Sequence, residues 1–175
     1  TLAAGEESNF SLALRGDATV WAWGSNLFGQ LGDNTTAAKS VPVQVKGMGG
    51  SGFLTNITAI AKGSNHSLAV QFAGPVWAWG DNQFGALGDN TTTQRNTPVQ
   101  VSGLTGVAVF NSVAAGAYHS LARKSDGTVW AWGDNAAGQL GDNTSGNQRN
   151  TPVQVLGPGG AGFLTGVAAI AAGGN

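Results

Sequence analysis

Short apolar runs, separated by clusters of Gly, Asn, Asp, Ser and Pro, follow one another along the whole chain. One of these runs, Val-Trp-Ala-Trp-Gly, occurs three times, and each copy leads into a near-copy of Gly-Gln-Leu-Gly-Asp-Asn-Thr. The copies lie at Val20–Gly24, Val76–Gly80 and Val129–Gly133. They recur with a period of roughly 55 residues, in the range where one repeat is one supersecondary unit. The pattern therefore predicts a repeat protein.

Each repeat contains four such runs, which predict four short strands. The first run ends in Ala-x-Gly, the second reads Ser-Leu-Ala, the third is the tryptophan run and the fourth reads Pro-Val-Gln-Val. The first run covers 57–63, 107–116 and 167–173, with residues 1–5 as the tail of another copy; the second covers 11–13, 67–69 and 120–122; the fourth covers 42–45, 98–101 and 152–155. Turn residues join the second and third runs as a hairpin, and the proline suits an edge strand.

These strands predict an all-β fold of about three four-stranded blades, of the kind found in β-propellers. We expect one repeat array over residues 1–175. Its approximate repeats are 1–56, 57–106 and 107–166, and a further repeat starts at 167–175.

The paired tryptophans explain how such blades would adhere. Residues two apart on a strand point the same way, so Trp21 and Trp23 share one face, while Val20, Ala22 and Gly24 share the other. The bulky face of one blade can pack on the small face of its neighbour. The predicted structural framework is Trp21, Trp23, Trp77, Trp79, Trp130 and Trp132.

Composition narrows the function classes. The chain has no Cys, so a disulfide framework or a thiolate metal site is excluded. A formal charge of −1 offers no broad field for nucleic acid or an anionic membrane, and neither partner is expected. No apolar run reaches the length of a membrane span, and residues 1–10 lack the features of a signal peptide.

Two sets of polar residues recur in the repeats, and each has a functional and a structural interpretation. The Asp-Asn pairs could supply calcium ligands, but none lies in an Asp-x-Asp-x-Asp-Gly loop, and turns capped by the aspartate side chain explain them better. The pairs are Asp33-Asn34, Asp89-Asn90 and Asp142-Asn143. Lys39, Arg95 and Arg149 recur at one repeat position and are candidate partner contacts. Because each shares its loop with one of the aspartates, a locally neutral loop is the alternative.

His66 and His119 occupy the same repeat position, directly before Ser67 and Ser120. Adjacent strand residues point to opposite faces, so each His-Ser pair is poorly placed for proton transfer. Phe10 fills the equivalent position of the first repeat, which indicates that packing accepts an apolar ring there. With no paired carboxylates or metal cluster either, we expect no catalytic residue, no metal and no cofactor.

Differences between the repeats are where a function would reside. Residues 47–54 and 157–164 form long Gly-rich linkers, predicted as rim loops that either contact a partner or serve as flexible filler. In the turn after the tryptophan run, Phe28 and Phe84 correspond to Ala137. These two rings are candidate partner contacts, with packing beneath the loop as the alternative.

The order Ala-x-Gly-x-x-His-Ser-Leu-Ala, Val-Trp-Ala-Trp-Gly-x-Asn, Gly-Gln-Leu-Gly-Asp and Pro-Val-Gln-Val resembles the RCC1 (regulator of chromosome condensation) repeat, especially its bacterial versions. The resemblance covers essentially the whole chain. It implies a β-propeller, commonly of about seven blades, whose members act as binding platforms. Those members include an exchange factor for a small GTPase that binds chromatin, a plant ultraviolet photoreceptor, ubiquitin-ligase modules and a secreted bacterial inhibitor of β-lactamases.

Three blades cannot close a ring, so their outer faces need a cover. We expect either self-association, in which the final strand completes the first blade of another copy, or a piece of a longer propeller. The leading functional hypothesis is a non-enzymatic scaffold that binds a protein through variable loops such as 82–86 and 135–138.

The alternatives are a self-associating structural or surface-display module, secreted or at a bacterial cell surface, and a guanine-nucleotide-exchange regulator. Exchange with chromatin binding calls for a basic face that the charge balance does not offer. Ultraviolet sensing calls for Gly-Trp-Arg-His-Thr runs, which this chain lacks.

Overall fold

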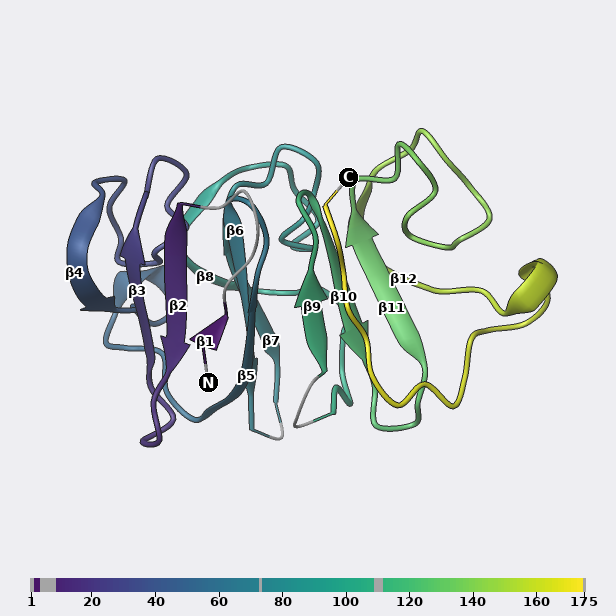
Figure 1. Ribbon diagram of the computed structural model, residues 1–175, viewed down its shortest axis with the longest axis horizontal. Coiled ribbons are helices and arrows are strands. Elements are labelled where there is room, and N and C mark those ends of the chain that lie inside the picture. The colour runs from purple at the N-terminus through teal and green to yellow at the C-terminus, as the bar shows by residue number, and fades with distance from the viewer. Residues whose placement is uncertain (1, 4–8, 73, 109–111, 175) are drawn as a thin grey trace.

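The computed structural model describes residues 2–3, 9–72, 74–108 and 112–174. It contains three four-stranded antiparallel sheets, each with its strands in chain order, standing side by side as blades 1, 2 and 3 without closing a ring (Figure 1). Blade 1 holds β1 (Leu2–Ala3), β2 (Phe10–Leu14), β3 (Val20–Gly24) and β4 (Lys39–Gln44). Blade 2 holds β5 (Ile57–Lys62), β6 (His66–Gln71), β7 (Val76–Gly80) and β8 (Arg95–Gln100). Blade 3 holds β9 (Val113–Ala115), β10 (His119–Arg123), β11 (Val129–Gly133) and β12 (Arg149–Gln154). The predicted fold class is confirmed.

Two short 3₁₀ turns lie in the Gly-rich linkers, η1 (Met48–Gly50) and η2 (Pro158–Gly160). Each linker is closed by one antiparallel bridge, Lys46 with Phe53 and Leu156 with Phe163. No helix in the described residues is long or apolar enough to cross a membrane.

The glycine that ends each tryptophan run marks a change of register. In blade 1 the pairing of β3 with β4 shifts between Ala22 and Gly24. Gly24 adopts φ +109°, and a Cβ at this position would collide with the carbonyl oxygen of Asn9. Only glycine has both the conformation and the space required. Gly80 and Gly133 repeat this arrangement in blades 2 and 3.

The second tryptophan of each pair lies between blades. Trp79 is fully buried in a core cluster with Leu12, Val20 and Ala22 of blade 1. Its indole Nε1 donates a hydrogen bond of 2.9 Å to the carbonyl oxygen of Gln30. The bulky face of blade 2 therefore packs on the small face of blade 1, with its one polar atom satisfied.

The next interface repeats this contact. Trp132 is fully buried in a cluster with Leu68, Val76 and Ala78 of blade 2, and its Nε1 donates to the carbonyl oxygen of Ala86 at 2.8 Å. A Cβ on Gly88 would lie 2.8 Å from that indole nitrogen, so the glycine leaves the ring its space.

The other four tryptophans are half-buried. Trp77 and Trp130 pack at the edges of the two inter-blade clusters. Trp21 and Trp23 lie on the face of blade 1 that points away from blade 2, because Ala22 between them faces blade 2. The six framework residues therefore split into two rings at the centre of the interfaces, two at their margins and two on the outer face of blade 1.

The predicted first strand of a further repeat, residues 167–173, is not a strand among the described residues. It lies where the next blade would place its inner strand, since Gly173 approaches Gly116 just as Gly116 approaches Gly63. It runs beside blade 3 in Figure 1 and pairs with no strand of the described residues. The predicted run 107–116 is also a strand only at Val113–Ala115, and residues 109–111 lie outside the described part.

The inner position of blade 1 is occupied by the chain itself. Leu2 pairs with Ala13 and Ala3 pairs with Leu12, so β1 is the first strand of that sheet. The idea that residues 167–173 of another copy complete blade 1 is therefore wrong for this register, because that position is filled.

Replacing Trp79 with Ala should lower the free energy of unfolding by about 3–5 kcal/mol, since a large buried ring is lost and a cavity remains. The matched control is Trp23→Ala, at the same position of the first repeat. It should cost only about 1–2 kcal/mol because its ring is half-buried. Urea unfolding in dilute solution measures both values. Equal losses would show that the blade interface does not carry the stability.

Candidate functional site

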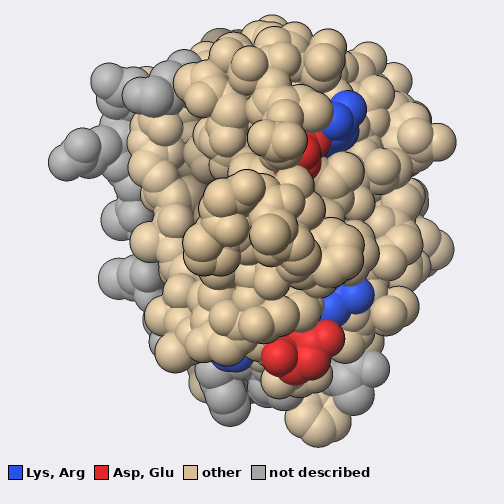
Figure 2. Space-filling model, turned by 90° about the vertical axis from the view of Figure 1, so that its right-hand side faces the viewer, with Lys and Arg blue, Asp and Glu red and all other residues tan. Residues whose placement is uncertain are grey.

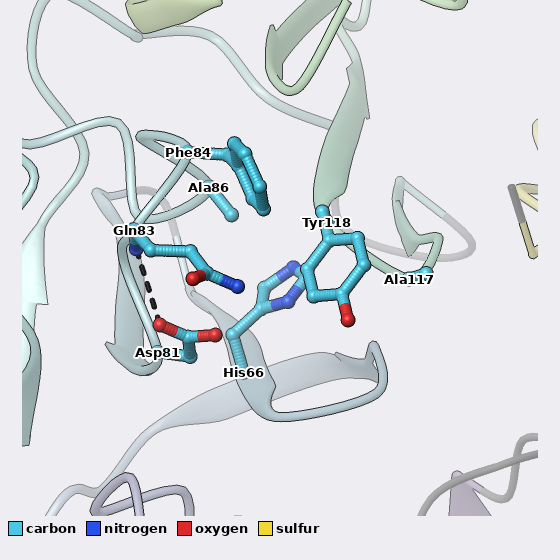
Figure 3. Close-up of a pocket in the computed structure, with 7 residues that line it drawn as sticks. All are labelled: His66, Asp81, Gln83, Phe84, Ala86, Ala117 and Tyr118. Carbon is cyan, nitrogen blue, oxygen red and sulfur yellow. Dashed lines mark hydrogen bonds between the residues drawn. The ribbon is translucent and has the colours of Figure 1, made fainter. Parts of the chain in front are cut away.

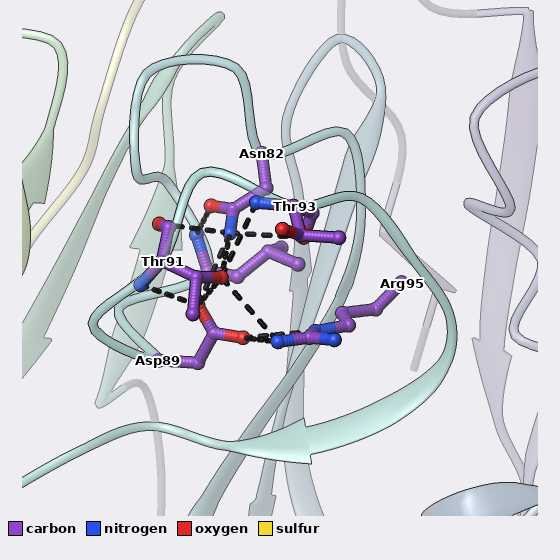
Figure 4. Close-up of polar contacts among 6 residues, drawn as sticks. Asn82, Asp89, Thr91, Thr93 and Arg95 are labelled. Carbon is purple, nitrogen blue, oxygen red and sulfur yellow. Dashed lines mark hydrogen bonds and ion pairs between the residues drawn. The ribbon is translucent and has the colours of Figure 1, made fainter.

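The loop after β7 is held closed by a buried amide (Figure 4). Asn82 is fully buried, and its Nδ2 donates to Asp89 Oδ1 and to the carbonyl oxygens of Thr91 and Thr93, each at 3.1 Å. Its Oδ1 accepts the backbone N–H of Leu87 at 2.9 Å. One side chain thus satisfies several backbone groups of a loop that has no ladder of its own. Asn26 and Asn135 hold the equivalent loops of blades 1 and 3. We call these three residues the clamp asparagines, and the hydrogen bonds that each makes to its loop the clamp.

The aspartate of this loop joins the clamp to a cation. Asp89 Oδ1 accepts the backbone N–H of Thr91 at 3.1 Å, the predicted turn capped by the aspartate, and Oδ2 pairs with Arg95 Nη2 at 2.7 Å. Burial alone would raise the pKa of Asp89, but the hydrogen bonds from Thr91 and Arg95 outweigh it and hold the pKa below its ordinary value. The carboxylate therefore stays charged and the ion pair persists.

The other two candidate cations are placed in the same way. Lys39 Nζ lies 3.3 Å from Asp33 Oδ2, and Arg149 Nη2 lies 2.7 Å from Asp142 Oδ2. Each cation is thus paired with its loop aspartate and remains partly exposed. Within the described residues, no three His, Asp or Glu side chains gather closely enough to hold a metal ion.

His66 contacts a serine of the neighbouring blade and not the serine that follows it in the sequence. His66 Nε2 lies 2.9 Å from Ser120 Oγ, a residue 54 positions later in the neighbouring blade, and not against the adjacent Ser67. Ser120 Oγ donates to the carbonyl oxygen of Ala86 at 2.8 Å, so its proton is committed and His66 Nε2–H is the donor. Burial, followed by the nearby His119, lowers the pKa of His66 to about 3. A neutral imidazole that donates to the serine does not activate it as a nucleophile.

The aromatic candidates lie at the rim beside this contact. Phe84 is half-buried, and its ring meets that of Tyr118 edge to face, with 5.2 Å between the centroids and 62° between the planes. Phe28 is also half-buried, whereas the preceding Leu27 is 74 % exposed. The candidate Phe84 therefore bridges two blades at the surface.

A crevice opens at this rim between blades 2 and 3 (Figure 3). Asp81 and Phe84 reach it from the loop after β7, and Tyr118 reaches it from the turn before β10. His66 lies between them (Figure 3). As it stands, the crevice is too narrow to hold a water molecule. Neither Asp81 nor Tyr118 was a sequence candidate, because only the packing of blade 3 on blade 2 brings them to one crevice.

His66 should make the fold sensitive to acid. Its pKa is lower in the folded than in the unfolded chain, so the unfolded chain binds more protons between these pKa values. The free energy of unfolding should therefore fall by roughly 1 kcal/mol per pH unit as the pH drops from about 6.5 toward 3. Stability above that range should be unaffected by this group.

The variant His66→Phe tests this contribution, since Phe10 holds the equivalent position of blade 1 and is buried there. Denaturant unfolding at a series of pH values should give a shallower slope for the variant than for the unchanged chain. Identical slopes would mean that His66 is not a buried neutral group.

Curated relatives align over short segments of much longer proteins. The chain is 35% identical over 144 residues to the human E3 ubiquitin-protein ligase HERC2, covering 82% of this chain and 3% of that protein. It is 36% identical over 122 residues to the ultraviolet-B receptor UVR8 of Arabidopsis thaliana, covering 70% of this chain and 27% of the receptor. The chain therefore spans only a small part of these relatives.

Solved structures share the fold. Prp20p of Saccharomyces cerevisiae, described with its binding to Gsp1p and histones, matches with a TM-score of 0.76 and 23% identity over 90% of this chain and 38% of that one. The yeast RCC1 protein (Prp20) bound to Kap60 matches with a TM-score of 0.74 and 25% identity over 99% of this chain and 39% of that one.

The family assignment follows from sequence models of the repeat. The model of the regulator of chromosome condensation (RCC1) repeat matches residues 17–70, 73–123 and 126–175, and a second model of the same repeat matches 2–30, 57–86 and 110–139. The matches cover most of the chain, and those of the second model each span the first three strands of one blade. The chain belongs to the RCC1 repeat family.

Proposed function

We propose that this chain is a non-enzymatic scaffold that binds another protein through the variable loops at one rim of its blades. The observation that carries the proposal is that recurring polar residues fix the loop shape of each repeat, while the exposed residues of the loop vary from repeat to repeat. The polar residues that recur in the repeats make internal hydrogen bonds. They are the clamp asparagines, the loop aspartates Asp33, Asp89 and Asp142, and the serines Ser67 and Ser120 between the blades. They hold the loops in shape and are already satisfied.

The positions that differ between repeats lie on top of these clamps. The residue after each clamp asparagine is Leu27, Gln83 or Ala136, and all three are exposed. A shared loop conformation thus displays a different side chain in each blade. Conformationally fixed loops with varied side chains suit the binding of one particular protein surface.

The relatives support this proposal by analogy. The yeast structures are described with Gsp1p, histones and Kap60, all of which are proteins. In this chain, the loop cations are balanced by aspartates, which argues for a partner recognised by shape and apolar contact more than by strong charge.

Substituting the exposed rim should weaken capture of the partner. We expect Leu27→Asp, combined with Phe84→Ala, to reduce recovery from an extract of the source cells by about tenfold or more, since a few apolar anchors dominate such interfaces. Val41→Asp is the matched control, because Val41 is 65 % exposed on β4 and away from the rim loops. Quantitative affinity capture with mass spectrometry is the measurement. Equal loss with the control variant would contradict binding through the rim.

The outer faces of the array favour a second candidate, a structural or surface-display module that self-associates. Figure 2 views the molecule from the side of blade 3 and η2, where few charged side chains interrupt the surface. At the other end of the array, Trp21 and Trp23 are only half-buried. Because the two end faces differ, self-association would be head to tail, giving rings or filaments. A display role would place the protein outside a bacterial cell.

Solution mass separates the two candidates. Self-association predicts a particle of at least twice 17.5 kDa by light scattering, returning to the monomer mass with Trp23→Ala. A well-folded particle of 17.5 kDa at high concentration would contradict the second candidate and leave the first unchanged.

A further inference from the structure

Asp81 carries a buried carboxylate oxygen without a partner. The residue follows β7 directly and is 8 % exposed. Its Oδ1 accepts the backbone N–H of Gln83 at 3.1 Å. Its Oδ2 has no hydrogen-bond donor among the described residues, and the ion pairs of that part of the chain do not include Asp81. A buried carboxylate oxygen without a donor lowers the stability of the fold, so a ligand that donates a hydrogen bond to it would bind favourably.

Blade 3 shows what completes the same position elsewhere. Asp134 is the equivalent of Asp81, and its Oδ2 accepts Gln139 Nε2 at 3.0 Å. Gln139 belongs to the recurring Gly-Gln-Leu-Gly stretch, and its Oε1 accepts the backbone N–H of Ala137 at 2.9 Å. In blade 3, an amide side chain from the repeat itself therefore donates a hydrogen bond to the oxygen that lacks a donor in blade 2.

Blade 2 has lost this amide. Ala86 stands where the first and third repeats have Gln30 and Gln139, and a methyl group has no donor to offer. The first repeat keeps its glutamine but has Ser25 in place of the aspartate. Among the three described blades, only blade 2 combines the carboxylate with the missing amide.

The walls around the open oxygen suit a cation. Phe84 and Tyr118, in edge-to-face contact, stand at the mouth of the crevice, and Figure 3 shows Asp81 facing the same space. Aromatic rings beside a carboxylate favour an ammonium group through both charge and ring quadrupole. His66 does not supply that charge, since its Nε2 proton is committed to Ser120.

The geometry distinguishes lysine from arginine. Arginine binds carboxylates best with two parallel hydrogen bonds to both oxygens, whereas only Oδ2 of Asp81 is without a donor. Lysine presents a single charge on a slender stem and needs only one oxygen. The side chain of Gln83 is exposed, so it can move aside to widen the crevice.

We propose that the crevice between blades 2 and 3 binds a lysine side chain of the protein partner, whose ammonium group donates to Asp81 Oδ2 beside the rings of Phe84 and Tyr118. This assignment rests on the proposed scaffold function, because it names the chemistry by which one rim position recognises a partner.

A short peptide tests the site without the partner. The ¹⁵N-labelled chain is titrated with acetyl-Ala-Lys-Ala-amide, and the backbone amide shifts of Gln83, Phe84 and Tyr118 are followed by NMR. We expect saturable shifts with this peptide and none with the same peptide acetylated on the lysine Nε. The absence of saturable shifts, or equal shifts with the acetylated peptide, would overturn the proposal.

Variants locate the binding. Ala86→Gln introduces the residue found at this position in the other two repeats, and it should weaken binding about tenfold or more by giving Asp81 Oδ2 an internal donor. Asp81→Asn should weaken binding to the same extent. The matched control Asp134→Asn should leave binding unchanged, because Asp134 already has Gln139. Unchanged affinity in Ala86→Gln, with its NMR spectrum showing an intact fold, would refute the assignment.

The two proposals fail separately. If the lysine peptide does not bind while a partner is still captured through the rim, only the lysine site is wrong. If the peptide binds and no partner is captured, the site stands and the scaffold function falls.

Discussion

The contact between the second tryptophan of one blade and the small face of the blade before it is the interaction on which this structure depends. Trp79 and Trp132 each bury a whole indole and donate their single polar hydrogen to a carbonyl of the neighbouring loop. Ser67 and Ser120 donate to the same two carbonyls. The loop that receives these bonds must therefore keep its shape, and the buried clamp asparagine beneath it maintains that shape.

Much of the fold could be predicted from the sequence because its signals are local and repeated. The alternation within Val-Trp-Ala-Trp-Gly places both rings on one face, and the structure has strands at all three copies. Residues 167–173 match the first run of each repeat but form no strand, and they pair with no other strand of the described residues. Local pattern predicts which segments can pair and does not supply the partner.

The candidate site was harder to predict, because its contacts join different repeats. The bond from His66 to Ser120 crosses 54 positions, and sequence alternation could exclude the adjacent serine without identifying this partner. The sequence shows that Asp81 and Asp134 are equivalent, but only the structure shows that Asp134 Oδ2 has a donor and Asp81 Oδ2 has none. Ala86 is a departure from a repeat pattern, and its meaning depends on what the missing glutamine does in blade 3.

The second indoles seal the blade interfaces, and hydrogen exchange of the indole N–H groups tests this most directly. NMR can follow the Nε1 protons of Trp79, Trp132 and Trp23 in one sample. The Trp79 and Trp132 protons should exchange only at the rate of global unfolding, while that of half-buried Trp23 should exchange much faster. Exchange of Trp79 and Trp132 as fast as that of Trp23 would contradict the account.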